Sequence, residues 1–288
     1  MIKEIKSVAC FLEEISRLCN RIQQSIQENN SVPESDKTTV KWFFRGHSNE
    51  NWSLLPSLFR PIKQQEEILK MTRNMQNTYF PEEQFLRQEA ERLSPESFSS
   101  CKNDISRMAV AQHYEIPTRL LDVSENALVA LYFATESFVT EKEGKVDGKV
   151  FVFRTSVYDY RIASTGGKTK KVKIENYHVN QNKTNRKPLF DKPTLFLPPL
   201  MTVRQKVQGG AFLFFENGKT GNVIEMPENK VSGIKIPANF KKLIRDELDT
   251  MCGINMETLF PDGLASYNKR IVRDAEMRIK ADFSDIPT

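Results

Sequence analysis

Long hydrophobic runs are missing from this sequence, and their absence bears on where the protein works. The longest uninterrupted apolar stretch, Ala127 to Ala134, is eight residues long, whereas a helix that crosses a membrane needs about 20 apolar residues. The mean hydropathy is −0.50, and the first five residues lack the apolar region of a signal peptide. The composition therefore predicts a cytoplasmic protein with no membrane partner.

Cysteine is also scarce, and its spacing argues against metal and disulfide chemistry. The four cysteines, Cys10, Cys19, Cys101 and Cys252, include no Cys-x-x-Cys pair, which is the usual spacing of zinc and redox motifs. Cys10 and Cys19 lie in one helical pattern, about 13 Å apart at a rise of ~1.5 Å per residue. That separation is too large for a disulfide bond, so we expect reduced thiols and no bound metal.

The chain has little excess charge of either sign. Lys and Arg number 42 and Asp and Glu 37, which gives a net charge of +5. This balance permits contact with polyanions but lacks the strong basic excess of a dedicated nucleic-acid binder. The basic run Lys168–Lys173 has no aromatic residues between its lysines, which favours a solvated loop over a nucleic-acid contact. No Gly-rich phosphate loop, Ser-His-Asp set or catalytic carboxylate pair is recognisable.

Hydrophobic periodicity predicts helices at both ends of the chain. Apolar residues recur every three or four positions from Val8 to Ile26, which predicts an N-terminal helix over 7–28. Similar patterns over 237–250 and 264–281 predict a C-terminal helical part spanning 237–281. Between them we expect helices at 63–77, 82–93 and 104–114, and a helix capped by Ser124 that runs to about Phe138.

Strand patterns fill the middle of the chain. Strands are predicted at 41–46, 118–122, 149–154, 194–198, 211–216, 222–226 and 231–236. The segment 164–193 is rich in Lys, Asn, Thr and Gly, and we expect an exposed excursion with at most brief strands there. Together these elements predict an α+β fold with a central, mostly antiparallel sheet and helices at both ends. We expect a single domain over 1–288, with its core at about 38–217.

Several motifs, in order along the chain, resemble those of the FRG domain family. The triplet Phe44-Arg45-Gly46, followed by His47, matches the motif that gives the family its name. Other segments that resemble family motifs are Trp52–Leu58, Ala111–Asp122, Ala127–Ala134, Arg204–Phe212 and Leu259–Asp262. The resemblance spans roughly residues 5 to 270. It implies a bacterial domain of the kind found near mobile elements and phage-defence genes, with a role in defence or as a toxin.

The chain departs from the family pattern at a few positions. Val123 stands where a tryptophan usually follows the aspartate, and Gln205 replaces an isoleucine after Arg204. Glu125-Asn126 replace a small residue and a proline. The polar residues of the motifs are retained.

Arg45 and His47 flank a glycine at the end of an aromatic strand, an arrangement that suits a ligand. A guanidinium binds phosphate or carboxylate through a planar fork of donors, and Gly46 is expected to let a ligand approach the backbone. In the alternative, Arg45 pairs with a carboxylate such as Asp122 and locks the sheet.

Polar residues also gather around Pro117. His113 ends a predicted helix, where it serves either as a C-terminal cap or in acid–base or ligand chemistry. On the following strand, alternation places Thr118 and Asp122 on one face and Arg119 on the other. A charged residue in apolar surroundings needs a partner, so we expect an Arg–Asp ion pair. That pair is either structural or orients an arginine toward a ligand.

Arg204 and Gln208 are expected on a later strand, beside the glycines that precede Ala211. The order of these elements is similar to that of ADP-ribosyltransferases. That similarity implies NAD as the ligand, catalytic roles for Arg45, His47, His113 and Gln208, and ligand binding by Thr118, Arg119, Asp122 and Arg204. Gln208 stands where those enzymes place a glutamate, and a glutamine carries no charge to stabilise a developing cation.

Two other function classes stay open. In one, an arginine cluster of Arg45, Arg119 and Arg204 binds a nucleotide-type small molecule without turning it over, as a sensing module or one that also engages a protein partner. In the other, the protein acts on nucleic acid through the basic run and the same arginines. The modest net charge and the lack of a stacking platform count against the latter. Enzyme activity is not decided by the sequence.

Overall fold

The computed structural model describes residues 4–28, 40–60, 88–114, 116–136, 146–156, 160–165, 168–173, 193–197, 203–216, 226 and 231–261. Within these ranges, six strands form one sheet: β1 (Val40–His47), β2 (Leu120–Ser124), β3 (Gly148–Ser156), β6 (Thr194–Phe196), β7 (Gly210–Phe214) and β8 (Val231–Ile236). Their order across the sheet is β6-β7-β2-β1-β3-β8, and every neighbouring pair is antiparallel. The predicted α+β class with an antiparallel central sheet is therefore confirmed.

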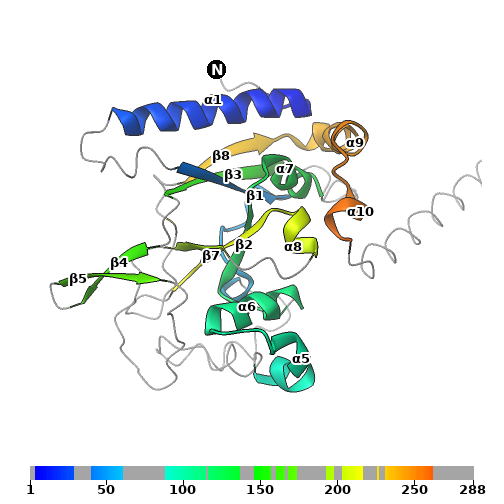
Figure 1. Cartoon of the computed structure of the whole chain (residues 1–288). Helices are drawn as coiled ribbons and strands as arrows, with labels where there is room; N and C mark the ends of the chain where they lie inside the picture. The colour runs from blue at the N-terminus through cyan, green and yellow to red at the C-terminus, as the bar shows by residue number, and fades with distance from the viewer. Residues whose placement is uncertain are drawn as a thin grey trace, which may run out of the picture.

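Helices from the N-terminal part, the middle and the C-terminal part of the described chain cover one side of strands β1, β3 and β8 (Figure 1). They are α1 (Val8–Gln27), α7 (Ala127–Ala134), α9 (Lys241–Cys252) and the short α10 (Met256–Leu259). Ser7 caps α1 by accepting a hydrogen bond from the Cys10 amide, so this helix begins where its apolar pattern begins. Phe11 of α1 and Leu131 of α7 are completely buried in the shared core. Burial of each such side chain stabilises the fold by about 1.5–3 kcal/mol.

Glycines of β1 and β3 allow α7 to lie directly against the sheet. A Cβ atom on Gly46 would stand 1.9 Å from the carbonyl oxygen of Ala130, and one on Gly148 would stand 2.2 Å from that of Ala134. Both contacts are with helix backbone, which cannot rotate away as a side chain can. The absent side chain of Gly46 therefore makes room for α7, a role that the sequence analysis did not assign to it.

The remaining strands have their own helical cover. Apolar residues of α6 (Asp104–His113) pack against Leu120, Phe212 and Phe214 of β2 and β7. The short α5 (Pro95–Phe98) packs beside α6, and α8 (Val203–Val207) precedes β7. The 3-10 turn η1 (Ser57–Phe59) follows β1, and η5 (Ala238–Phe240) precedes α9. In Figure 1, α5 and α6 lie at the opposite end of the molecule from α1.

Some helix and strand boundaries differ from the predicted ones. The strand expected at 118–122 runs from Leu120 to Ser124. Ser124 is not the cap of the next helix, because Asn126 accepts the hydrogen bond from the Leu128 amide and α7 starts at Ala127. The predicted end of that helix, Phe138, lies outside the described residues.

The excursion expected at 164–193 begins inside a hairpin of β4 (Tyr160–Thr165) and β5 (Lys168–Lys173). Brief strands were allowed for in this segment, but the loop predicted for the basic run Lys168–Lys173 is wrong, because that run pairs with β4. Residues 88–93 are helical, as expected for the end of the helix at 82–93. The predicted helices at 63–77 and 264–281 lie outside the described residues, as does the predicted strand at 222–226 except for Met226.

Candidate functional site

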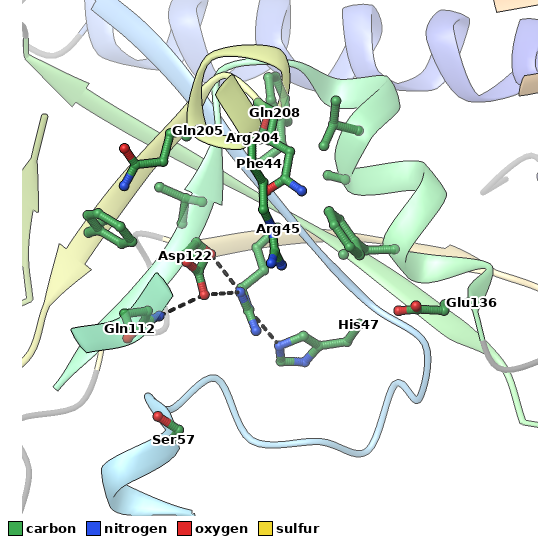
Figure 2. A pocket seen from close by; sticks show the side chains of 18 of the residues that line it. Phe44, Arg45, His47, Ser57, Gln112, Asp122, Glu136, Arg204, Gln205 and Gln208 are labelled. Carbon is green, nitrogen blue, oxygen red and sulfur yellow. Dashed lines mark hydrogen bonds and ion pairs between the residues drawn. The ribbon is translucent and has the colours of Figure 1, made fainter. Parts of the chain in front are cut away.

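Strands β1 and β2 meet at a single point and then separate. Their register contains one pair, Phe44 with Ser124, whereas β1 pairs with β3 along its whole length, from Val40 to His47. Beside this junction lies a cavity of about 430 Å³, a volume within the usual range for ligand pockets. Its walls come from β1, β2, α6, α7, α8 and the segment between β1 and η1 (Figure 2).

Arg45 bridges the gap between the two strands. Its Nη1 donates to the carbonyl oxygen of Asp122 at 2.7 Å and lies 3.9 Å from the Asp122 carboxylate oxygen Oδ2. Its Nε donates to Nε2 of His47 at 3.0 Å. The side chain of Arg45 is 18% exposed and that of Asp122 is 60% exposed. The expected Arg–Asp pair is thus made by Arg45, but its carboxylate is open to solvent instead of sealed in the core.

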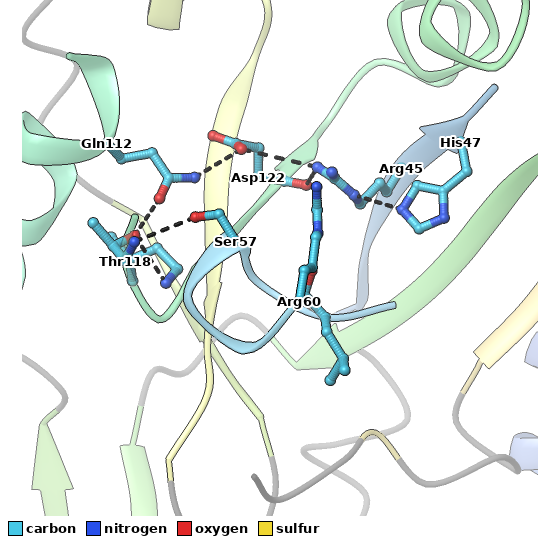
Figure 3. A network of polar contacts seen from close by, with 9 residues as sticks. Arg45, His47, Ser57, Arg60, Gln112, Thr118 and Asp122 are labelled. Carbon is cyan, nitrogen blue, oxygen red and sulfur yellow. Dashed lines mark hydrogen bonds and ion pairs between the residues drawn. The ribbon is translucent and has the colours of Figure 1, made fainter. Parts of the chain in front are cut away.

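Gln112 of α6 holds Asp122 from the other side (Figure 3). Its Nε2 donates to Asp122 Oδ2 at 2.8 Å, and its Oε1 accepts a hydrogen bond from the Thr118 hydroxyl. The Thr118 amide in turn donates to the Ser57 hydroxyl at 3.3 Å. A continuous polar chain therefore connects η1, α6, β2 and β1. Thr118 and Asp122 share Gln112 as a partner, as the predicted alternation along this strand requires.

His47 is neutral and carries its proton on a defined nitrogen. Because Nε2 accepts from Arg45, the proton of the neutral ring lies on Nδ1. Nδ1 is buried near the Trp52 backbone, and among the described residues no partner lies in hydrogen-bonding geometry. Burial and the positive charges of Arg45 and Arg60 lower the pKa of His47 to about 3. The imidazole is therefore a hydrogen-bonding group, not a cation, at neutral pH.

Two arginines lie side by side at the cavity. Arg60 follows η1 and anchors its Nε to the Leu55 carbonyl at 2.9 Å, and in Figure 3 its guanidinium points toward that of Arg45. Burial lowers the pKa of Arg45 to about 10; the Asp122 carboxylate opposes this shift and the charge of Arg60 adds to it. Burial also lowers the pKa of Arg60, again opposed by Asp122. Both groups stay protonated at neutral pH, so positive charges are held close together.

Arg204 and Gln208 reach the cavity from a helix and a turn, not from the predicted strand. Arg204 belongs to α8, and its guanidinium carbon lies 4.5 Å from the ring centre of Phe260. Gln208 donates from Nε2 to the Leu259 carbonyl at 2.9 Å, and its own carbonyl accepts the Ser124 hydroxyl at 2.6 Å. Gly209 makes this turn with a positive φ of 55°. Gln208 therefore also ties α10 to β2.

The other predicted site residues differ in their positions relative to the cavity. His113 lines the cavity from the end of α6. Thr118 lies behind the lining residues and supports Gln112. Arg119 is 4% exposed and lies over the Phe214 ring at 5.9 Å, away from the cavity lining. The predicted cluster of Arg45, Arg119 and Arg204 is thus wrong in one member, because Arg60 takes the place of Arg119.

The cavity-lining residues that sequence reasoning did not assign to the site include Arg60, Trp52, Gln112 and Glu136. Trp52 begins one of the motifs named above, and its side chain is 52% exposed. Gln112 stood within a recognised motif, so its position was a usable signal. Arg60 and Glu136 stand outside the motifs, and nothing in their spacing marks them.

Metal and membrane features were searched within the described ranges. There, no group of three or more His, Cys, Asp or Glu side chains is arranged to hold a metal ion. No helix in this part of the chain combines the length and apolar content that a membrane crossing requires.

In a comparison with protein families, the model of the FRG domain matches residues 40–143. This range contains β1, β2, α6, α7 and most of the cavity lining. No curated protein and no solved structure matched the chain.

Proposed function

Since the chain carries an FRG domain over residues 40–143, we propose that the cavity of this domain binds a nucleotide-type ligand through its phosphate groups. The observation that carries the proposal is the pair of adjacent guanidinium groups of Arg45 and Arg60. Holding like charges together out of bulk water is costly unless an anion compensates them. The carboxylate of Asp122 is half-open to solvent and compensates them only in part.

The donors that remain on these arginines suit a phosphate. Arg60 uses Nε for the Leu55 carbonyl, and its two terminal nitrogens make no hydrogen bond within the described part of the chain. Arg204 adds a third guanidinium to the lining, and Ser57 adds a hydroxyl. Phosphate oxygens accept several charge-assisted hydrogen bonds at once, and arginine forks match their geometry.

Calorimetry with NAD, ADP-ribose and a short RNA tests this proposal. We expect heat of binding with at least one of the two dinucleotide-type ligands, and a loss of about tenfold or more in affinity for Arg60→Ala. The matched control is Arg92→Ala, because Arg92 is an exposed arginine paired with Glu89 at 2.7 Å, outside the cavity lining. Absence of heat with every ligand would reject the proposal. Binding of the RNA alone would favour a protein that acts on nucleic acid.

ADP-ribose transfer is a second candidate, favoured by one lining residue. Glu136, just after α7, brings a carboxylate to the same cavity as His47 and Arg45 (Figure 2). Such a reaction develops positive charge at the anomeric carbon of the ribose, and a carboxylate stabilises that charge while a glutamine does not. We propose that Glu136, not Gln208, supplies this group if the domain is a transferase.

Release of nicotinamide from NAD distinguishes a transferase from a binding module. A transferase predicts turnover by the wild type, loss of turnover in Glu136→Gln and retained affinity for NAD in that variant. Turnover that Glu136→Gln leaves unchanged rejects the assignment of Glu136. Tight binding with no turnover favours a sensing module.

The biological role that we propose is defence against phage or action as a toxin, and it rests on the family resemblance. Expression of the wild type in a bacterial host is expected to lower plaque formation or slow growth, whereas Arg60→Ala is expected to do neither. Equal effects of the two proteins would separate the biological role from the cavity.

A further inference from the structure

In the segment 48–60, which follows β1, the aromatic side chain of Trp52 lies outside the apolar core. Leu54, Leu55 and Phe59 pack against the cluster around Phe43, whereas Trp52 lines the cavity and is 52% exposed. A large aromatic side chain contributes to stability when it is buried, so an exposed indole at a cavity wall contributes little to the fold. Exposed aromatic surface inside a pocket is more useful for holding a ligand.

The backbone around Trp52 is fixed in place. The Glu50 amide donates to the Asp147 carbonyl at 2.8 Å, and the Trp52 amide donates to the Asn49 carbonyl at 3.2 Å. The carboxylate of Glu50 pairs with Lys235 at 3.0 Å. The indole is therefore presented by a turn that is tied to neighbouring strands, which lowers the entropy lost when a ligand packs against it.

Trp52, His47 and Arg45 follow one another along one side of the cavity. The indole meets the imidazole edge to face, with ring centres 6.2 Å apart, and the imidazole accepts a hydrogen bond from Arg45. Phe151 supports the imidazole, with ring centres 5.0 Å apart. An aromatic surface thus lies one ring away from the arginines that the proposed function assigns to phosphate.

From this arrangement we propose that Trp52 is the platform on which the base of the nucleotide stacks. The inference rests on the proposed function and extends it, because it names the base as the part of the ligand that contacts Trp52. A flat π-system stacks on an indole whatever its hydrogen-bonding pattern. The site is therefore expected to prefer ligands that carry both a phosphate and a base over sugar phosphates that lack a base.

The two tryptophans of the chain make the test direct. Trp42 lies on β1 and packs against the helix-covered core, so Trp42→Phe leaves Trp52 as the single tryptophan, whose emission can be excited apart from that of the tyrosines, and serves as the matched control. The probes are ADP, which has a base, and ribose 5-phosphate, which has none. We expect ADP, but not ribose 5-phosphate, to quench the fluorescence of the Trp42→Phe protein.

Affinity measurements complete the experiment. Trp52→Ala is expected to weaken ADP binding about tenfold or more, because stacking on an aromatic side chain contributes that much per base, and to leave ribose 5-phosphate binding unchanged. Trp52→Phe is expected to retain most of the ADP affinity. Equal affinity for the two probes in the wild type, or an equal loss for both in Trp52→Ala, overturns the stacking proposal and leaves phosphate binding intact. Failure of both probes to bind the wild type overturns the stacking proposal, and absence of heat with NAD and ADP-ribose as well overturns the proposed function.

Discussion

Alternate residues of strand β1 have contrasting surroundings. Phe44 and Gly46 meet the helix-covered core, where Phe44 is buried and the backbone of α7 fills the space beside Gly46. Arg45 and His47 meet the polar network, where a guanidinium spans the gap to β2 and one imidazole nitrogen is left without a partner among the described residues. Both sets border the cavity, but the first packs against apolar side chains and helix backbone, whereas the second places polar groups there. The Phe-Arg-Gly triplet therefore contributes both to the packing of α7 and to the polar wall at which we propose that a ligand binds.

The largest effect is expected from Gly46→Ala, which places a methyl group between β1 and α7. The new methyl group would stand 1.9 Å from the Ala130 carbonyl oxygen and 2.6 Å from the Ala134 amide nitrogen. Because α7 must move to make room, we expect the free energy of unfolding to fall by about 3 kcal/mol or more, measured by urea denaturation.

Gly233→Ala is the matched control for that experiment. A Cβ atom there would meet only the side-chain carbons of Lys149, with the nearest at 2.4 Å, and a flexible lysine can turn aside. We expect a cost below about 1 kcal/mol. Equal stability of the two variants would show that α7 does not rest on β1 as described.

The second largest effect is expected from Arg45→Lys. A lysine keeps the charge but cannot donate at once to His47 Nε2 and to the Asp122 carbonyl, as the guanidinium does. We expect a loss of about 1–3 kcal/mol in the free energy of unfolding, because a buried acceptor then lacks its donor.

Arg60→Lys is the comparison for Arg45→Lys. Within the described residues, Arg60 makes one hydrogen bond, to the Leu55 carbonyl, so its change to lysine is expected to cost less than about 1 kcal/mol of stability. The same variant is expected to weaken phosphate binding. If the two lysine variants unfolded at the same denaturant concentration, the structural role of Arg45 would be refuted.

Sequence patterns were sufficient where one physical signal governed the outcome. The apolar residues from Val8 to Ile26 repeat at helical spacing, and α1 covers that stretch. The aromatic run at 41–46 became β1, because bulky side chains on alternating faces suit a strand between two packed layers. Arg45, His47, His113 and Gln208 were grouped from motifs, and all four line one cavity.

Patterns failed where the three-dimensional neighbour decides. A glycine next to Arg45 fits a close approach by a ligand or by a helix equally well, and only the fold reveals α7 beside Gly46. Arg60 reaches the cavity because η1 folds back on β2, where the Leu58 amide donates to the Thr118 carbonyl at 3.2 Å. The five residues of α8 are too few for helical periodicity to appear, so Arg204 was assigned to a strand.

The third effect is a dependence of stability on pH that comes from His47. Its pKa is lowered to about 3 in the folded protein, compared with about 6.5 for an unperturbed histidine. Below about pH 6.5 the His47 imidazole binds a proton in the unfolded chain but stays neutral in the folded protein. The free energy of unfolding therefore falls as the pH falls toward 3. The slope from this one group approaches about 1.4 kcal/mol per pH unit.

His47→Gln removes this titration and keeps an acceptor near Arg45. Urea denaturation of both proteins between pH 7 and pH 4 gives the difference in their free energies of unfolding, in which the effects of other titrating groups cancel. We expect the wild type to lose stability faster than the variant as the pH is lowered. Parallel curves would mean that the ring is protonated in the folded protein and that Arg45 does not donate to it.

The smallest effect is expected at the other end of β1, where a charge pair joins β1 to the residue that follows β2. Lys41 and Glu125 lie 3.1 Å apart, and both side chains are close to half exposed. Solvent and salt screen such a pair, so a double-mutant cycle with Lys41→Ala and Glu125→Ala should give a coupling of about 0–0.5 kcal/mol. A coupling above about 1 kcal/mol would mean that this surface pair contributes substantially to the association of β1 with β2. If this coupling is negligible while Arg45→Lys causes a large loss of stability, the main interaction between β1 and β2 is instead the one made by Arg45, the side chain that also faces the proposed ligand.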